Sequence, residues 1–136
     1  MKETTNLAKS VLELKSLYFD TIEFRRKENI VTNPELNMNF SREVKQDAQN
    51  PSHFWLTLGT NITDKQKDAV VINLSLVGEF IVSADKDSFD IWRLIKEEGV
   101  AIVFPYLRSE LTLLTTQPGF QPIVLPAVNI AKMFQN

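Results

Sequence analysis

The sequence predicts an α+β fold in which a four-stranded antiparallel sheet is covered on one side by C-terminal helices. Two observations predict it. Four segments with alternating apolar and polar residues come first in the chain, and helical patterns follow only after Asp87. The connections between the four segments are short, so neighbouring strands must run antiparallel, because parallel pairing needs long crossovers. Strands followed by helices, rather than alternating with them, are typical of the α+β class.

Each of the four strands is predicted from its own alternation. In the first, over residues 11–27, the residues expected on the apolar face are Leu12, Leu14, Tyr18, Ile22 and Phe24, with Leu17 and Phe19 opposite. In the second, the apolar set is Leu36, Met38, Phe40 and Val44. The third is expected over residues 53–63 and the fourth over residues 69–83, where Gly78 predicts a bulge or a bend. One face of this sheet is strongly apolar and needs a cover.

Two helices are predicted to supply that cover. Asp87 or Ser88 can cap the first, over residues 89–98, and Gly99 is expected to end it. Pro105 fits a helix only in its first turn, so the second helix is expected to begin at residues 102–104 and to end near Thr116. A turn over residues 117–122, an extended segment over residues 123–126 and a last helical turn over residues 130–134 are expected to follow.

The second predicted helix has an apolar arc that covers roughly half of its circumference or more. Such a helix must bury two faces, one on its own sheet and one elsewhere. The residues we assign to an oligomer interface are Phe104, Leu107, Glu110, Leu111 and Leu114. Glu110 falls inside the arc, and two interpretations stay open for it. It either pairs with Arg93 or Arg108 of another subunit, or reaches solvent at the edge of the arc.

Composition excludes several classes of function. The chain has no cysteine, which excludes disulfides, iron–sulfur clusters and thiolate zinc sites. Its one histidine, His53, has no nucleophile motif beside it and too few partner donors for a metal site, so we expect neither an enzyme nor a cofactor or metal. A net charge of −2 without a basic stripe argues against nucleic acid. No segment has the apolar length of a signal peptide or a membrane span, so one soluble, cytoplasmic domain over residues 1–136 is expected.

Three motifs in the last third of the chain resemble the bacterial protein-export chaperone SecB family. They are IVFPYLRSE at residues 102–110, TTQPGF at residues 115–120 and LPAVNI at residues 125–130, in the same order and with nearly the same spacing. The resemblance implies a homotetramer, built as a dimer of dimers, with the helix around Leu111 at a subunit interface. It also implies a chaperone that binds unfolded precursor polypeptides in apolar grooves without ATP and keeps them soluble for translocation in protein export.

The resemblance places a client-binding groove on specific residues. Those carried over by matched position are Leu36, Met38, Phe40 and Phe134. Phe120 and Ile130 are added to the groove for their apolar chemistry rather than for a matched position. The competing interpretation is that most of these side chains belong to an ordinary hydrophobic core.

The partner that would receive the client is not predicted to be the SecA motor through its usual contacts. Family members that deliver clients to SecA carry acidic groups at positions that hold Thr21, Arg25 and Asn73 here, and the sequence ends two residues after Phe134. An alternative function is therefore that of a dedicated SecB-like chaperone in a toxin–antitoxin system, protecting an antitoxin. A third hypothesis, a small-molecule-binding or enzymatic α+β domain, has no identifiable catalytic residues to support it.

Overall fold

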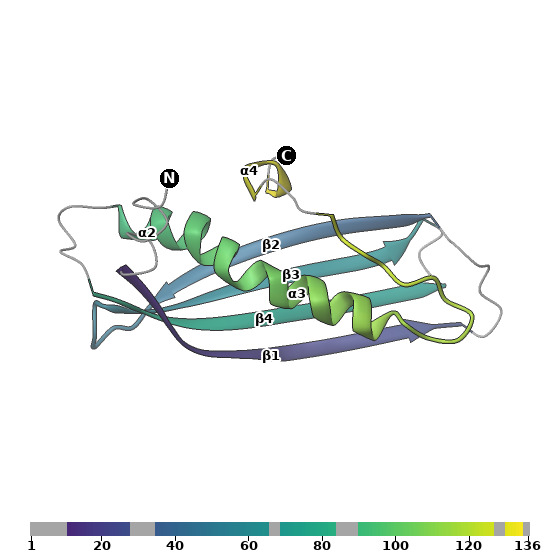
Figure 1. Cartoon of the computed structure of the whole chain (residues 1–136), viewed down its shortest axis with the longest axis horizontal. Helices are drawn as coiled ribbons and strands as arrows, with labels where there is room; N and C mark the ends of the chain where they lie inside the picture. Colours follow the sequence, from purple (N-terminus) through teal and green to yellow (C-terminus); the bar gives the residue numbers. More distant parts are fainter. Residues whose placement is uncertain (1–10, 28–34, 66–68, 84–89, 127–129, 135–136) are drawn as a thin grey trace.

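The computed structural model describes residues 11–27, 35–65, 69–83, 90–126 and 130–134. Four antiparallel strands form one sheet: β1 (Leu12–Arg26), β2 (Leu36–Gln46), β3 (His53–Asp64) and β4 (Val70–Val82). Their order is β1-β4-β3-β2, so β1 and β2 are the edges of the sheet. The helical elements are α2 (Ile91–Leu94), the π-helical η2 (Ile95–Gly99), α3 (Val100–Leu114) and α4 (Ile130–Met133). The predicted fold class is confirmed (Figure 1).

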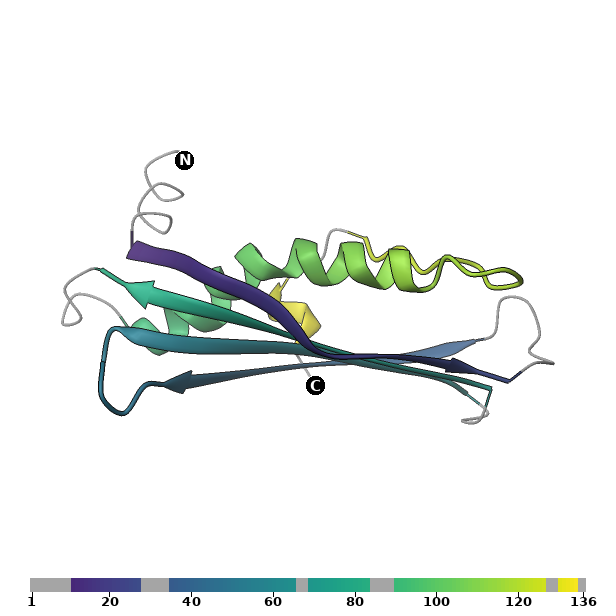
Figure 2. The same cartoon turned by 90° about the horizontal axis from the view of Figure 1, so that it is seen from below.

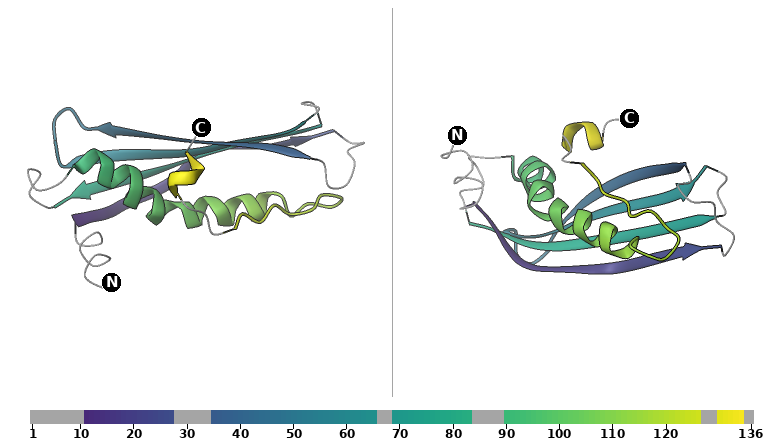
Figure 3. Two further views of the ribbon diagram at one scale, coloured as in Figure 1. Left: turned by 90° about the horizontal axis from the view of Figure 1, so that it is seen from above. Right: turned by 45° about the vertical axis from the view of Figure 1, so that its right-hand side comes forward.

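The elements α2, η2 and α3 form one continuous helical rod along one face of the sheet. Figure 2 shows this rod on one side of the strands, while no described segment covers the other side. The rod crosses the sheet obliquely, because η2 contacts β2 and β3 whereas α3 contacts β3 and β4. After α3 the chain turns at Gly119, the one described glycine of positive φ, and runs back towards β2, beside which α4 lies (Figure 3). The rod therefore leaves the first half of β2 uncovered.

The expected break between two helices does not exist. Gly99 has helical dihedrals, φ −61° and ψ −42°, so it does not end a helix. Its lack of a side chain serves packing instead, because a Cβ at this position would lie 3.3 Å from Leu56 Cδ2. Pro105 lies inside α3 rather than in its first turn. Both Pro105 and Ala101 are exposed, so the Ala101 carbonyl, which loses its amide partner to the proline, can bond to water.

A second glycine also serves close packing. Gly78 was expected to mark a bulge or bend, yet β4 pairs with β3 without interruption through it. A Cβ there would lie 3.1 Å from Val103 Cγ1 on the helical rod. Gly78 and Gly99 together let the rod approach the sheet closely. On the side of the rod that faces the sheet, the side chains of Val103, Leu107 and Leu111 are fully buried.

Strand β1 departs from the predicted alternation because it contains two irregularities. Its pairing with β4 shifts register between Leu14 and Ser16 and again between Phe19 and Thr21. An extra residue in a strand reverses which side chains face the core, so a pattern counted through it falls out of phase. Leu17 and Phe19 therefore pack against the core, and Tyr18 lies on the outer face with 52% of its surface exposed. This arrangement is the reverse of the expected one.

Among the described residues, no helix is both long enough and apolar enough to cross a membrane.

Candidate binding groove

An open hollow of about 460 Å³ lies along the free edge of β2. We call it the β2 groove, and its lining residues are Met38, Asn39, Phe40, Ser41, Arg42, Met133 and Phe134. The side chains of Asn39 and Ser41 belong to the opposite face of the sheet, because they alternate with Met38 and Phe40.

The sequence of β2 explains why apolar side chains remain accessible in this groove, next to polar ones. Alternation places Met38, Phe40 and Arg42 on the face that carries the helical rod, but the rod passes over the other half of the strand. Met38 therefore remains 39% exposed and Phe40 half-buried. Met133 and Phe134, both half-buried, close the groove from the C-terminal side. Two methionines give the walls flexible side chains that can adapt to differently shaped apolar groups.

Arg42 connects the three parts of the chain that meet at the groove. Its guanidinium carbon lies 4.3 Å from the ring centroid of Phe134, which is the geometry of a cation–π contact. Its Nη1 atom donates a hydrogen bond of 2.7 Å to the carbonyl oxygen of Lys96 in η2. Arg42 thus holds the C-terminal segment and the helical rod to β2.

The structure brings together half of the residues predicted for a client groove. Met38, Phe40 and Phe134 line it, whereas Leu36 lies at the start of the strand, on the same face but outside the lining. Phe120 lies elsewhere, because the turn at Gly119 folds its ring back onto the sheet. There Phe120 is 8% exposed and packs edge-to-face on Phe24 at 5.3 Å, as part of the core. The side chain of Ile130 is outside the described residues.

The list of residues predicted for the groove left out Arg42 and Met133. The alternation that predicts Met38 and Phe40 places Arg42 on the same face, two residues further on, so the signal for Arg42 was present. The signal for Met133 was its position beside Phe134 in the last helical turn. No local pattern reveals that this turn lies beside β2.

Of the five residues predicted at an oligomer interface, three are buried within their own chain instead. Leu107 and Leu111 are 0% exposed and Phe104 is 8% exposed, so these three side chains are buried on the chain's own sheet and offer almost no surface to a partner. Glu110 and Leu114 are half-buried.

The outer side of α3 carries its own apolar residues. Tyr106 is 52% and Leu113 is 68% exposed, and the half-buried Ile102 lies one turn before Tyr106. Residues at these spacings share one side of a helix. We call Ile102, Tyr106 and Leu113 the outer stripe of α3, and Glu110 lies between its last two members in sequence.

The uncovered face of the sheet carries a group of polar side chains. A second hollow, of about 320 Å³, surrounds Gly59 there, and Thr21 and Asn73 are among its lining residues. Asn73 donates from Nδ2 to Glu23 Oε1 at 2.5 Å and accepts from Asn61 Nδ2 at 2.6 Å. Arg25 pairs with Glu23, with Nε 2.9 Å from Oε2. Thr21, Arg25 and Asn73 are thus gathered on one face, which at these positions carries hydroxyl, amide and guanidinium groups.

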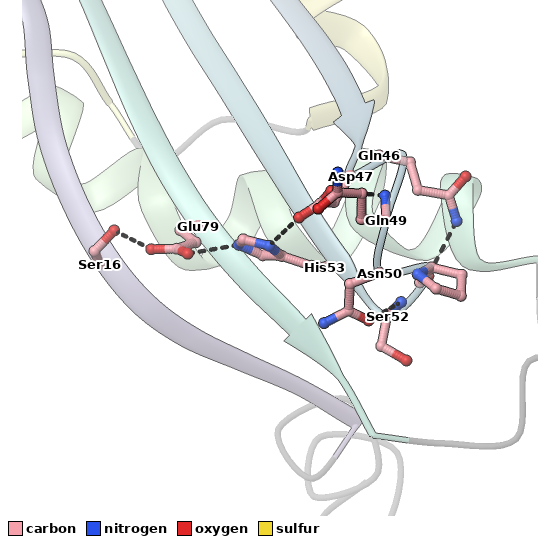
Figure 4. A network of polar contacts seen from close by, with 9 residues as sticks. Ser16, Gln46, Asp47, Gln49, Asn50, Ser52, His53 and Glu79 are labelled. Carbon is pink, nitrogen blue, oxygen red and sulfur yellow. Dashed lines mark hydrogen bonds and ion pairs between the residues drawn. The ribbon is translucent and has the colours of Figure 1, made fainter.

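His53 lies between two carboxylates on this same face (Figure 4). Its Nδ1 atom is 3.0 Å from Asp47 Oδ2, and its Nε2 atom is 2.5 Å from Glu79 Oε2. The Ser16 hydroxyl donates to the other oxygen of Glu79 at 2.8 Å. Because this hydroxyl is bonded to a carboxylate rather than to the imidazole, the cluster has no activated nucleophile. It links β1, β4 and β3 to the turn that follows β2, which is a structural role.

The charges around His53 determine the protonation of the cluster. The hydrogen bond to Asp47, with that to Glu79, raises the pKa of His53 above its ordinary value of 6.5. The pKa of Asp47 is lowered from 3.8, first by the Gln49 backbone amide and then by His53. The pKa of Glu79 is lowered from 4.5, first by Ser16 and then by His53. The folded chain therefore favours an imidazolium between two carboxylates.

Stability is expected to depend on pH through His53. A raised folded-state pKa contributes stability in full below pH 6.5, and the contribution disappears as the pH rises through that pKa. The two carboxyl groups have the opposite pH dependence. Their pKa values are lowered by folding, so their contribution to stability is lost as the pH falls through those values. The melting temperature of His53→Gln should fall furthest below that of the unmodified chain between about pH 5 and pH 6.5, and the gap should narrow towards pH 9. A gap that stays constant over this range in thermal melts would contradict the proposed charge state.

Comparison with known proteins places the chain in a family. Residues 5–136 match the family model described as preprotein translocase subunit SecB. An uncharacterized protein of Methanocaldococcus jannaschii is 29% identical over 105 residues, which cover 74% of this chain and 66% of that protein. The protein-export protein SecB of Xanthomonas euvesicatoria is 27% identical over 107 residues, which cover 78% of this chain and 62% of that protein. The match thus spans less than two thirds of the length of these two relatives.

A solved structure has the same fold. It is a SecB-like chaperone of Mycobacterium tuberculosis in complex with a ChAD peptide from the HigA1 antitoxin. The two chains superpose with a TM-score of 0.72 over 92% of each, at 13% sequence identity. The family model covers nearly the whole chain and includes the three motifs that resemble SecB. The chain belongs to the SecB family.

Proposed function

We propose that the protein is an ATP-independent chaperone that holds unfolded polypeptides in the β2 groove and keeps them soluble for export. One observation supports this proposal most strongly: a SecB-family chain presents an open groove in which apolar side chains, including Met38 and Phe134, remain partly exposed. Affinity comes from burying apolar client side chains, roughly 25 cal/mol per Å² before the cost of ordering the client. Such binding selects for unfolded chains rather than for one sequence.

The proposal also includes assembly in the cytoplasm as a homotetramer, a dimer of dimers. The outer stripe of α3 supports it, because Tyr106 and Leu113 are large side chains exposed on the same side of one helix, about two turns apart. Tyrosine is enriched at protein interfaces, where its ring is buried and its hydroxyl finds a partner. The half-buried Glu110 would lie at the edge of this contact.

A second candidate function is that of a dedicated chaperone for an antitoxin. Two observations favour it. The solved SecB-like chaperone is bound to an antitoxin peptide. In addition, Thr21, Arg25 and Asn73 replace the acidic groups with which family members are expected to meet SecA. Purification of the tagged protein from its own cells separates the two functions, because an export chaperone retains a spread of precursors and a dedicated one retains a single dominant partner.

Titration with a permanently unfolded polypeptide, reduced and alkylated at its cysteines, tests the shared part of the proposal. We expect a dissociation constant of roughly micromolar or lower for the unfolded polypeptide and no binding of its native, disulfide-bonded form. Equal binding of both forms, or of neither, would contradict it.

A further inference from the structure

The β2 groove contains a cation, Arg42, that has no anionic partner in the part of the chain that the structure describes. Arg42 is half-buried, and its contacts are the carbonyl oxygen of Lys96 and the ring of Phe134. No carboxylate among the described residues pairs with it. By contrast, Arg25 pairs with Glu23 on the uncovered face of the sheet. A half-buried guanidinium attracts an anion more strongly than a fully exposed one does, because less water screens it.

The contacts of Arg42 hold its guanidinium in place and leave most of its donors available. A guanidinium has five N–H donors in a rigid plane, of which the bond to Lys96 uses one. The Phe134 ring lies against the guanidinium and is not a conventional hydrogen-bond acceptor for these N–H groups. Arg42 is therefore oriented in advance, beside the apolar side chains of Met38 and Phe40. A carboxylate is the anion that fits such a planar pair of donors.

We propose that Arg42 makes the β2 groove selective for apolar client segments that carry an Asp or Glu side chain. This inference rests on the proposed chaperone function. Met38, Phe40 and Arg42 follow one another at every second residue, about 7 Å apart along one face of the strand. An extended client lying along the edge of β2 has the same repeat. The preferred pattern is thus apolar-x-apolar-x-acidic, or its reverse, depending on the direction of the client.

Labelled peptides that differ at one position test this selectivity on the full chain. Each has a Leu-Ser-Leu-Ser-Asp core, with Asn or Lys replacing Asp in two matched peptides, and a second set has the reverse order. In fluorescence anisotropy at low salt, the Asp peptide of at least one order should bind about tenfold more tightly than its Asn counterpart, and the Lys peptide most weakly. The difference should narrow as salt is added, because salt screens the pairing of charges.

Two variants and one control assign the preference to Arg42. Arg42→Gln should bind the Asp and Asn peptides equally, and Arg42→Glu should prefer the Lys peptide. Lys45→Glu makes the same change of charge on the same strand, but on the opposite face, and should keep the preference for Asp. Circular dichroism confirms that each variant is folded, and Arg42→Gln alone decides the outcome if Arg42→Glu does not fold.

Each contrary result has a distinct meaning. Equal binding of all peptides by the unmodified chain would overturn the selectivity while leaving the chaperone proposal standing. A reversal of preference in Lys45→Glu would show that net charge, rather than Arg42, is responsible, and would also overturn it. If no peptide binds and the unfolded polypeptide does not bind either, the chaperone function fails, and the inference fails with it.

Discussion

Leu111→Asp is expected to unfold the chain, whereas Leu113→Asp should leave it folded and dissociate the assembly. Leu111 lies on the side of α3 that faces the sheet and is 0% exposed, whereas Leu113, two residues further on, is 68% exposed. A carboxylate buried without a partner costs several kcal/mol, which is comparable to the roughly 5–15 kcal/mol that stabilises a whole domain. On the outer stripe the same carboxylate stays hydrated in the monomer and becomes costly only when a second subunit covers it.

Circular dichroism and light scattering coupled to gel filtration distinguish these two effects. We expect Leu111→Asp to lose its secondary structure, and Leu113→Asp to keep it and to elute with a lower mass than the unmodified chain. An unchanged mass for Leu113→Asp would show that the outer stripe does not hold subunits together. A folded Leu111→Asp would contradict the packing of α3 on the sheet.

Replacing two walls of the β2 groove is expected to remove client binding without unfolding the chain. Met38→Asn combined with Phe134→Asn deletes two partly exposed apolar side chains, each worth up to about 1.5–3 kcal/mol when a client covers it completely. Affinity for an unfolded polypeptide should fall at least about tenfold, while the melting temperature changes little because neither residue belongs to the fully buried core.

A matched control for this double variant lies on the same strand. Asn37 is exposed and alternates with Met38, so its side chain is on the opposite face. Asn37→Ser should bind the unfolded polypeptide as the unmodified chain does. If the double variant binds equally well, the client lies somewhere other than the β2 groove.

The sequence was sufficient to predict the strands and the fold class, because each strand has its own alternation of apolar and polar residues. It failed where the deciding contact is with a residue far away in the chain. Gly99 has the same sequence signature as a helix end, and only the approach of Leu56 shows that it serves packing. In β1, alternation was counted correctly but through two register shifts, which placed Tyr18 on the wrong face.

The candidate site was partly predictable for the same reason. Alternation and the resemblance to SecB identified Met38 and Phe40, since both follow from local pattern. A helical wheel gives the width of the apolar arc of α3 but not the part of the arc that the sheet covers. Leu107 was therefore assigned to a subunit interface, although its side chain is fully buried within its own chain. The pairing of Arg42 with Phe134 joins residues that are remote in sequence, and no local pattern contains it.

The most direct test of the central claim is suppression of aggregation by the purified protein without ATP. A slowly refolding client, diluted from denaturant, is followed by light scattering with and without the protein. We predict that stoichiometric amounts of the unmodified chain keep the client soluble, and that the Met38→Asn, Phe134→Asn variant does not. Undiminished scattering in the presence of the unmodified protein, even in molar excess over the client, would contradict the claim that this chain is a chaperone.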